Sequence, residues 1–454
     1  MKSLRNKLLN FIFYLRSNKK IFSELNTLKD FEKKTIEENL SIQKYNLEKI
    51  LKYSWQNIPY YRKVLEEAKV VINGNIHLEN FPKIKILDKE ILMKNFDTLI
   101  STEKKVKRNM YINYSGGSTG VPTKFIQNYN FKTLETATKW LFFTYLTDYP
   151  CKHISLWGSE RDIIKKKFMF KKNLMNFLQQ KLVLNSFQMT QENMINYVKK
   201  INKYKPEILE SYVQPIYELA QFIRRNNLEI IRLKGIITTA GTLYPEMKEL
   251  IEEVFQCPVL NRYGTREAGD IACSCCENQG LHVNVINNYL EILDDNLNPV
   301  KPGEIGQIYI TKLTNYSMPL IRYKIGDLGI LSEEISCKCG RGFPLIKFIE
   351  GREMCVFRTR QGRIIPTEFF IHFIGVVFNQ GIITKFQIIQ NEYEKITIKY
   401  ILESNIKRFE NNKQKIDDAI KKVMGENCEI IWQEVHDIPN LPSGKYLYSY
   451  SEIS

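Results

Sequence analysis

The sequence contains no run of about 18 apolar residues, so no segment is expected to cross a membrane as a helix. Internal repeats and low-complexity linkers are absent, and 22 glycines with 15 prolines are ordinary numbers, which excludes fibrous and disordered classes. Zinc-finger, RNP and helix-turn-helix patterns are missing, so no nucleic acid partner is expected. The pattern GxxxxGK[ST] is missing too, which argues against a Walker-type nucleotide fold.

The chain does carry enough apolar material for a large core. It has 454 residues, 43% hydrophobic and 12% aromatic, and this length allows two to four domains. Its formal charge of +16 comes from 66 Lys and Arg against 50 Asp and Glu. A biased base composition of the genome would explain such a lysine excess. The alternative is a surface that attracts anionic partners such as ATP, CoA, nucleotide sugars or acidic lipids.

The N-terminal segment is basic with an apolar centre. It has neither the long apolar run nor the small-residue cleavage site of a signal peptide, so a cytoplasmic protein is expected. One helix face would gather the apolar side chains Leu8, Leu9, Phe11, Ile12 and Leu15. The segment is either an ordinary amphipathic helix or a weak membrane-surface helix over residues 1–20, peripheral at the inner membrane face.

Apolar periodicity places helices and strands along the first half of the chain. Residues spaced as on a helix face predict helical stretches at about 130–145 and 190–227. Short apolar runs at 154–157 and 235–239, bounded by turn residues, predict buried strands. Helices alternating with buried strands indicate an α/β body.

The later part of the chain changes character. Short alternating segments separated by turns indicate a β-rich subdomain at about 270–350. Two further strands and a helix follow it. We therefore predict an α/β fold with a large N-terminal domain over 1–350, which includes the β-rich part, and a small α+β C-terminal domain over 351–454.

A segment rich in serine, threonine and glycine lies between Tyr114 and Lys124. Its central residues are Ser115, Gly116, Gly117, Ser118, Thr119 and Gly120. The glycines let the backbone turn sharply and approach a ligand, and successive N–H groups in such a turn form an anion-binding concavity. The alternative is a plain flexible turn.

Four further segments carry polar groups at turns. In Asn261–Glu267, Tyr263 could stack on a base while Glu267 holds Mg²⁺ through oxygen. Asp327, after a glycine, could accept hydrogen bonds from two ribose hydroxyls. The other two are a Gly-Arg pair ending at Arg352 and a Pro-Ser-Gly-Lys turn ending at Lys445. Each of these alone is equally compatible with a solvated turn.

Taken together and in this order, the five segments resemble the adenylate-forming superfamily of acyl-CoA synthetases and adenylation domains. Within it, the chain is most similar to phenylacetate-CoA ligase and the related capsular polysaccharide biosynthesis proteins. The resemblance covers nearly the whole chain, including residues 51–61 and the segment from Ala240 to Pro245. One departure lies after Arg352, where Met354 or Cys355 stands at the usual position of a hinge aspartate or lysine.

The resemblance implies a role for each matching residue. Ser115 to Thr119 would hold the triphosphate, Tyr263 would lie against adenine, and Asp327, supported by Arg352, would bind the ribose. The implied nucleotide-binding set is Ser115, Gly116, Gly117, Ser118, Gly120, Ala240, Tyr263, Gly264, Thr265, Asp327 and Arg352, and the implied catalytic set is Lys445, Glu267 and Thr119. The C-terminal domain of this group is mobile and brings its lysine in for adenylation.

The reaction implied is the ATP-dependent activation of a carboxylic acid as an acyl-adenylate, with Mg²⁺, followed by transfer to CoA. Transfer to an amine or hydroxyl of a cell-surface sugar is the alternative, raised by the likeness to capsule-related proteins. A third interpretation is a non-catalytic, zinc-stapled nucleotide-binding module, but it predicts erosion of Lys445 or Glu267, and both are present. Dimers are common in the resembling group, so a homodimer is an expectation.

Five of the nine cysteines fall in two tight groups. They are Cys273, Cys275 and Cys276, then Cys337 and Cys339, with His282 between the groups. In a reducing compartment such groups indicate metal ligands, and three cysteines with one histidine form a closed structural Zn²⁺ site. Part of the resembling group carries a similar pattern. The favoured set is Cys275, His282, Cys337 and Cys339, with Cys276 or Cys273 as substitutes; reduced buried thiols are the alternative.

Overall fold

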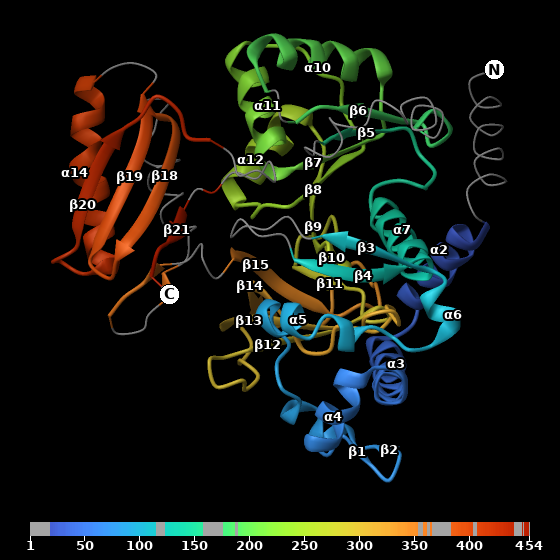
Figure 1. The fold of residues 1–454 in the computed structure, drawn as a ribbon. Helices are drawn as coiled ribbons and strands as arrows, with labels where there is room; N and C mark the ends of the chain where they lie inside the picture. Colours follow the sequence, from blue (N-terminus) through green and yellow to red (C-terminus); the bar gives the residue numbers. More distant parts are fainter. Residues whose placement is uncertain are drawn as a thin grey trace, which may run out of the picture.

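The computed structural model describes residues 19–114, 123–157, 176–186, 189–352, 357–360, 364–365, 383–402, 406–439, 447 and 449–453. Figure 1 shows a large body built around one long sheet and a smaller C-terminal unit beside it. The predicted α/β fold is confirmed. The basic N-terminal segment lies outside the described residues up to residue 18. Within the described part of the chain, none of the helices has the length and apolarity to cross a bilayer.

Three N-terminal helices pack against the β-rich end of the body: α2 (Lys19–Glu32), α3 (Ile36–Asn57) and α4 (Pro59–Glu67). Thr35 and Glu38 form a capping box that fixes the start of α3. Ile58 ends α3, and Pro59 starts α4 because proline is tolerated in the first helical turn. The side chain of Asn39 donates to the carbonyl oxygen of Gly342 at 2.7 Å, which ties α3 to the far end of the chain's β-rich part.

Short elements connect these helices to the sheet. They are β1 (Val71–Ile72), β2 (Asn75–Ile76), the 3-10 helices η1 (Leu78–Lys83) and η2 (Asp97–Leu99), and helices α5 (Lys89–Lys94) and α6 (Lys104–Lys107). A hairpin of β3 (Met110–Tyr114) and β4 (Lys124–Asn128) follows. The Ser/Thr/Gly segment connects the two strands of this hairpin, and Tyr114 pairs with Lys124 at the loop end.

Eleven strands of the described chain form one sheet in the order β12-β13-β14-β15-β11-β10-β9-β8-β7-β5-β6. Its parallel half contains β5 (His153–Leu156), β6 (Lys181–Leu184), β7 (Ile208–Tyr212), β8 (Gly235–Thr239) and β9 (Val259–Thr265). Its antiparallel half contains β10 (Gly269–Ser274), β11 (Leu281–Val283), β12 (Asn288–Leu293), β13 (Ile305–Lys312), β14 (Tyr323–Leu331) and β15 (Leu345–Arg352). The two halves join where β9 meets β10.

Helices cover both faces of the parallel half. Helix α7 (Tyr129–Phe143) packs on one face, where Ile208, Ile237 and Leu260 join its core. Helices α10 (Gln191–Tyr204), α11 (Val213–Arg225) and α12 (Pro245–Phe255) pack on the other. Because neighbouring residues of a strand point to opposite faces, each central strand contributes to both cores. The buried strands predicted at 154–157 and 235–239 are therefore confirmed as β5 and β8.

One predicted helix is wrong. The continuous helical stretch expected at 190–227 is two helices, α10 and α11, separated by the buried strand β7. Lys205 ends α10 in the left-handed conformation, and Pro206 follows it. The charged Glu210 in the middle of β7 hid the strand from an apolar pattern. Pro206 is the signal that could have revealed the break.

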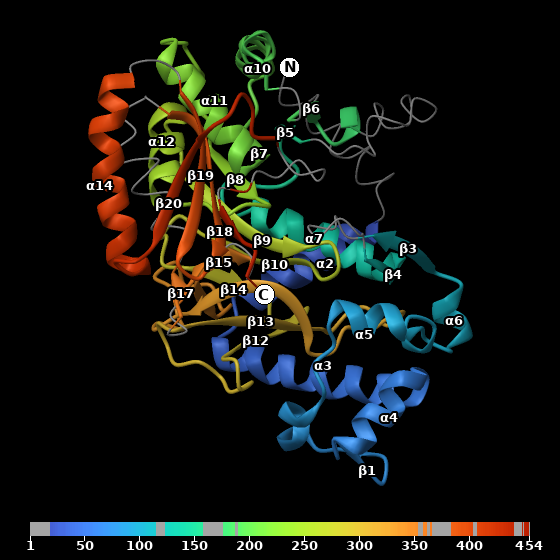
Figure 2. The same ribbon diagram turned by 60° about the vertical axis from the view of Figure 1, so that its left-hand side comes forward.

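The C-terminal unit is a four-stranded sheet with one long helix. It contains β16 (Phe357–Arg358), β17 (Ile364–Ile365), β18 (Ile383–Glu392), β19 (Lys395–Leu402), α14 (Ile406–Met424), β20 (Glu429–Glu434) and β21 (Ser449–Ser451), and the sheet order is β20-β19-β18-β21. Figures 1 and 2 both place this unit on the α11–α12 side of the body. One buried apolar cluster runs from these helices into Phe386 and Ile388 of β18.

A buried histidine in β5 gives the fold a pH dependence. Burial lowers the pKa of His153 to about 4, and its Nδ1–H donates to the carbonyl oxygen of Cys151 at 3.1 Å. An unfolded histidine titrates near 6.5, so between pH 6.5 and 4 the unfolded state binds more protons and stability falls as pH falls. This group alone contributes a loss of about 3 kcal/mol over that window.

The variant His153→Asn keeps a donor for Cys151 but cannot take up this proton. We expect the difference between its unfolding temperatures at pH 7.5 and pH 4.5 to be smaller than that of the unmodified protein. Differential scanning calorimetry at both pH values measures this difference. An identical difference in the two proteins would contradict the assignment.

Candidate active site

Two of the predicted nucleotide-binding residues, one near the end of β9 and one in the middle of β14, contact each other. The hydroxyl of Tyr263 donates to Oδ2 of Asp327 at 2.9 Å, although 64 residues separate them. Both side chains are buried, at 7% and 9% exposure, so the contact holds the ring and the carboxylate in fixed positions. Asp327 pairs in register with Arg352 of β15. The backbone of Arg352 therefore lies next to Asp327 on the neighbouring strand. The structure therefore brings these three positions together.

The turn after β9 is tightly built. A Cβ atom at Gly264 would lie 2.6 Å from the carbonyl oxygen of Gly269, so only glycine fits there. The hydroxyl of Thr265 accepts a hydrogen bond from the N–H of Ala268 at 3.0 Å. Gln127 of β4 donates from Nε2 to the carbonyl oxygens of Arg266 at 2.8 Å and Glu267 at 3.3 Å. These contacts fix the backbone that presents Glu267.

The predicted triphosphate segment, Ser115 to Gly120 with Thr119, lies outside the described residues. Its neighbours are described, because β3 ends at Tyr114 and β4 begins at Lys124. Arg266 donates from Nη1 to the carbonyl oxygen of Tyr114 at 3.3 Å. Tyr114, the residue before this segment, thus lies beside the turn that carries Glu267.

Ala240 follows the carboxyl end of β8 with a left-handed φ of +59°. Two residues on, the Thr242 hydroxyl lies 3.4 Å from the carbonyl oxygen of Glu350, to which it donates. The segment after β8 therefore touches the end of β15, close to Gly351. In open α/β sheets ligands bind at the carboxyl ends of the parallel strands, and this is the edge that these residues occupy.

Lys445 also lies outside the described residues. Two residues after it, the carbonyl oxygen of Leu447 accepts a hydrogen bond from Gln387 of β18 at 2.9 Å. Strand β21 then pairs in parallel with β18 from Ser449 onward. The predicted catalytic lysine therefore lies shortly before a segment that is bound to the C-terminal sheet.

Four of the predicted metal ligands gather in the β-rich part. The ligand atoms of Cys275, His282, Cys337 and Cys339 all lie within 4.8 Å of one another. Cys275 Sγ is 3.6 Å from Cys337 Sγ, and Cys339 Sγ is 3.3 Å from His282 Nε2. These separations fit a tetrahedral shell with metal–sulfur bonds of about 2.3 Å and a metal–nitrogen bond of about 2.0 Å.

His282 is prepared to ligate through Nε2. Its Nδ1–H donates to the carbonyl oxygen of Phe343 at 3.0 Å, which leaves the Nε2 lone pair facing the cysteines. Burial lowers the pKa of His282 to about 4, so the neutral imidazole that binds metals is the form present at pH 7. The donor set and this second hydrogen bond fit a structural Zn²⁺ ion.

Two cysteines named as substitutes lie outside this group. Cys276 is exposed, and its thiol lies 3.9 Å from the carbonyl oxygen of Tyr145. Cys273 is buried within β10 and pairs in register with Arg262 and His282. Cys276 is not among the four residues whose ligand atoms gather, so the proposed ligand set keeps Cys275, His282, Cys337 and Cys339.

Sequence reasoning missed the residues that join this cluster to the N-terminal helices. Arg341 donates to Glu32 Oε2 of α2 at 3.3 Å, and the hydroxyl of Tyr145 donates to Glu32 Oε1 at 2.5 Å. The guanidinium of Arg341 lies 4.0 Å from the centre of the Tyr145 ring. Burial raises the pKa of Glu32, and Arg341 opposes this shift. Only the Cys-x-Cys-Gly-Arg run hinted at a role for Arg341.

Comparison with known proteins agrees with this geometry. Residues 357–451 match the CapK C-terminal domain family. The chain is 26% identical to protein CapK of Staphylococcus aureus over 422 residues, covering 91% of this chain and 89% of that protein. It is 25% identical to phenylacetate-coenzyme A ligase of Thermus thermophilus over 345 residues, covering 72% and 73% of the two chains.

A solved structure of 2-hydroxyisobutyryl-CoA ligase in complex with R3-HIB-AMP has the same fold, with a TM-score of 0.71 and 16% identity. The superposition covers 92% of this chain and 90% of that one. The chain is therefore a homologue of CapK and the phenylacetate-CoA ligases, with the fold of the adenylate-forming ligases. The relationship to AMP-forming acid ligases that the sequence motifs predict is confirmed.

Proposed function

We propose that this protein activates a carboxylic acid with ATP, forms an acyl-adenylate and transfers the acyl group to CoA. The observation that carries the proposal is the contact of Tyr263 with Asp327 at the carboxyl edge of the sheet. It joins a ring suited to adenine and a carboxylate suited to ribose hydroxyls. Tyr114, which precedes the Ser/Thr/Gly segment, lies beside the adjacent turn, where a triphosphate would extend.

The chemistry needs charge stabilisation more than proton transfer. The carboxylate oxygen attacks the α-phosphorus, an acyl–oxygen–phosphorus bond forms, and the bond to pyrophosphate breaks. The nucleophile is already ionised, so no general base is required. Lys445 would neutralise the two anionic reactants, and N–H groups of residues 115–120 would bind the phosphates. Glu267 would hold Mg²⁺, which supplies further charge neutralisation when bound.

In the second half-reaction the thiol of CoA displaces AMP from the acyl-adenylate. One observation favours a second acceptor class, an amine or hydroxyl of a sugar. The similarity to CapK covers 91% of this chain, against 72% for the phenylacetate-coenzyme A ligase of Thermus thermophilus. The C-terminal unit also matches the CapK family. In the mobile-domain arrangement that the motifs imply, the C-terminal unit forms part of the acceptor site. Its similarity to the CapK family is therefore relevant to which acceptor the protein uses.

We also propose that Cys275, His282, Cys337 and Cys339 hold a structural Zn²⁺ ion. Four protein ligands leave no open coordination position, so the ion would stabilise the fold and take no part in the reaction. Its position next to Arg341 and Glu32 would join the β-rich part of the sheet to α2.

The test is ATP–pyrophosphate exchange with the full chain and a panel of aryl, fatty, amino and sugar acids. Exchange with one acid class is the expected result. Asp327→Ala should raise the KM for ATP about a hundredfold, because it removes charged hydrogen bonds worth about 3 kcal/mol in total. Tyr263→Phe keeps the ring and removes only its hydroxyl contact, so a change within about tenfold is expected.

Once the acid is known, AMP release is measured with CoA and with a sugar amine. The compound that accelerates AMP release is the acceptor. Absence of exchange with every acid, together with retained ATP binding, would favour the non-catalytic nucleotide-binding module. An Asp327→Ala variant with unchanged KM for ATP would contradict the ribose assignment even if exchange occurs.

A further inference from the structure

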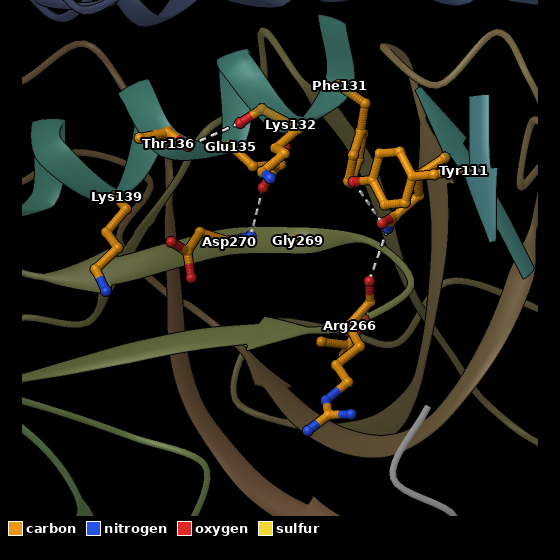
Figure 3. Close-up of a pocket in the computed structure, with 11 residues that line it drawn as sticks. Tyr111, Phe131, Lys132, Glu135, Thr136, Lys139, Arg266, Gly269 and Asp270 are labelled. Atoms are coloured by element: carbon orange, nitrogen blue, oxygen red, sulfur yellow. Dashed lines mark hydrogen bonds between the residues drawn. The ribbon is translucent and has the colours of Figure 1, made fainter. Parts of the chain in front are cut away.

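A cavity of about 290 Å³ lies beside the candidate nucleotide site (Figure 3). Helix α7 forms one wall, the β3–β4 hairpin a second, and the turn from β9 to β10 a third. The lining side chains used below are Gln127, Glu135, Lys139, Thr265, Arg266 and Asp270. A volume of this size accommodates a small ligand, or the non-reacting part of one.

The cavity shares a wall with the segment that carries Glu267. Thr265 and Arg266 line it directly. Gln127 lines it too, and donates to the carbonyl oxygens of both Arg266 and Glu267. A ligand in the cavity would therefore lie next to the residues proposed to hold ATP and Mg²⁺. That is the place for the body of an acid whose carboxylate faces the α-phosphate.

Charged groups of both signs surround this cavity. Figure 3 shows Glu135 reaching from α7 to the backbone of Asp270, whose N–H donates to Oε2 at 2.6 Å. Lys312 Nζ lies 2.6 Å from Glu135 Oε1, and the Lys312 side chain is fully buried. Burial raises the pKa of Glu135 to about 7, against the opposing charge of Lys312. A Cβ atom at Gly269 would overlap this carboxylate, so Glu135 is held against the strand.

The contacts continue behind Asp270. Arg262 Nε lies 3.4 Å from Asp270 Oδ1, and Arg262 Nη2 donates to Glu210 Oε1 at 2.7 Å. Lys139 Nζ lies 2.5 Å from the same oxygen of Glu210. Burial alone would raise the pKa of Glu210, but Lys139 and Arg262 hold it well below its usual range. Four strands and α7 thus contribute fixed charges to one connected group.

Arg262 positions two of the lining side chains from behind the cavity. Its side chain is 4% exposed and is not part of the lining. Arg262 contacts Asp270 and shares Glu210 with Lys139, and both Asp270 and Lys139 line the cavity.

We infer that this cavity selects a small, hydroxylated and otherwise uncharged carboxylic acid, and that Gln127, Lys139 and Asp270 recognise its hydroxyl groups. The inference rests on the proposed acid activation and names its substrate class. A hydroxyl both donates and accepts, so it can bind Asp270 as donor and Lys139 or Gln127 as acceptor. A second carboxylate would suit Lys139 but would repel Asp270 and Glu135.

Tyr111 and Phe131 also line the cavity, but the charged groups beside them disfavour an aryl or alkyl body. It would displace water from Asp270, Glu135 and Lys139 and return no hydrogen bonds. A site built to hydrogen-bond a substrate hydroxyl rejects the analogue that lacks it, by factors up to about 10⁴. The chain is therefore expected to differ from the proteins named phenylacetate-coenzyme A ligase in the acid that it prefers.

The test compares acids matched in carbon number by ATP–pyrophosphate exchange with the full chain. Glycerate is paired with propionate and gluconate with hexanoate, and phenylacetate is the aryl probe. We expect kcat/KM for at least one hydroxylated acid to exceed that of its unsubstituted partner and of phenylacetate by about a hundredfold or more. Preference for phenylacetate, propionate or hexanoate would overturn the inference and leave the proposed adenylation standing. Exchange with none of the acids would count against both.

A variant links the preference to this cavity. Asp270→Asn keeps the shape of the side chain and removes its charge, and Asp295→Asn makes the same change in the exposed turn after β12. In Asp270→Asn we expect kcat/KM for the preferred hydroxylated acid to fall at least about tenfold, with the KM for ATP unchanged. Asp295→Asn should match the unmodified protein. An equal effect of both variants, or a change confined to ATP, would overturn the role of the cavity.

Discussion

Replacing Lys445 with alanine is expected to lower the rate of ATP–pyrophosphate exchange by about 10²–10³-fold, with little change in ATP affinity. The lysine is proposed to act on charge that develops as the carboxylate reaches the α-phosphorus. An interaction of that kind lowers the barrier and contributes little to the ground-state binding of nucleotide. The triphosphate, base and ribose are assigned to residues of the N-terminal body, which this substitution leaves intact.

The residues that follow the lysine are bound to the C-terminal sheet. Gln387 fixes Leu447, two positions after Lys445, and β21 then pairs with β18. The described residues closest to the lysine on its C-terminal side therefore belong to the C-terminal sheet. Exchange kinetics and fluorescent-nucleotide titration of the variant measure rate and affinity separately.

Lys395→Ala is the matched control for this experiment. It removes a lysine from the same C-terminal unit, where Lys395 Nζ lies 3.5 Å from Glu429 at the surface. Such pairs contribute little, about 0–1 kcal/mol, so exchange should stay close to that of the unmodified protein. Undiminished exchange in Lys445→Ala would rule out the catalytic assignment. A loss of ATP affinity equal to the loss of rate would instead make the residue a nucleotide-binding group.

The sequence predicts the strands of the parallel half better than their arrangement. Runs such as Ile154–Trp157 are apolar because helices cover both faces, and this pattern is local. The order of the eleven strands depends on contacts between distant segments, and no local pattern encodes it. Strand β7 was missed for a related reason. Glu210 is satisfied by Lys139, Arg262 and Ser155, which come from three other elements.

The same limit applies to the candidate site. Motif order alone assigned Tyr263 and Asp327 to one nucleotide, but their direct hydrogen bond crosses the sheet and depends on its register. Glu135 carried no signal, since its partner Lys312 lies 177 residues away. The spacing of the cysteines could not exclude Cys276 as a ligand, because which thiol joins the group depends on the course of the chain after β10.

Purified protein is expected to contain about one zinc ion per chain, and Cys337→Ser is expected to lose it. Serine is a poor ligand for Zn²⁺, and its substitution leaves Cys275 and Cys339 without a shared ion. Metal binding is coupled to folding, so the variant should also unfold at a lower temperature, by about 2–4 °C for each kcal/mol lost. Elemental analysis and differential scanning calorimetry measure the two effects.

Cys276→Ser provides the matched control, since it changes the neighbouring exposed thiol and leaves the four ligand atoms in place. It should keep its zinc and its unfolding temperature. The destabilisation in Cys337→Ser should appear first at α2, because the loop of Cys339 reaches that helix through Arg341 and Glu32 and through the N–H of Gly342. Hydrogen exchange of residues 19–32 would detect it. Equal zinc content in both variants would exclude Cys337 as a ligand, and equal protection of α2 would separate the cluster from the N-terminal helices.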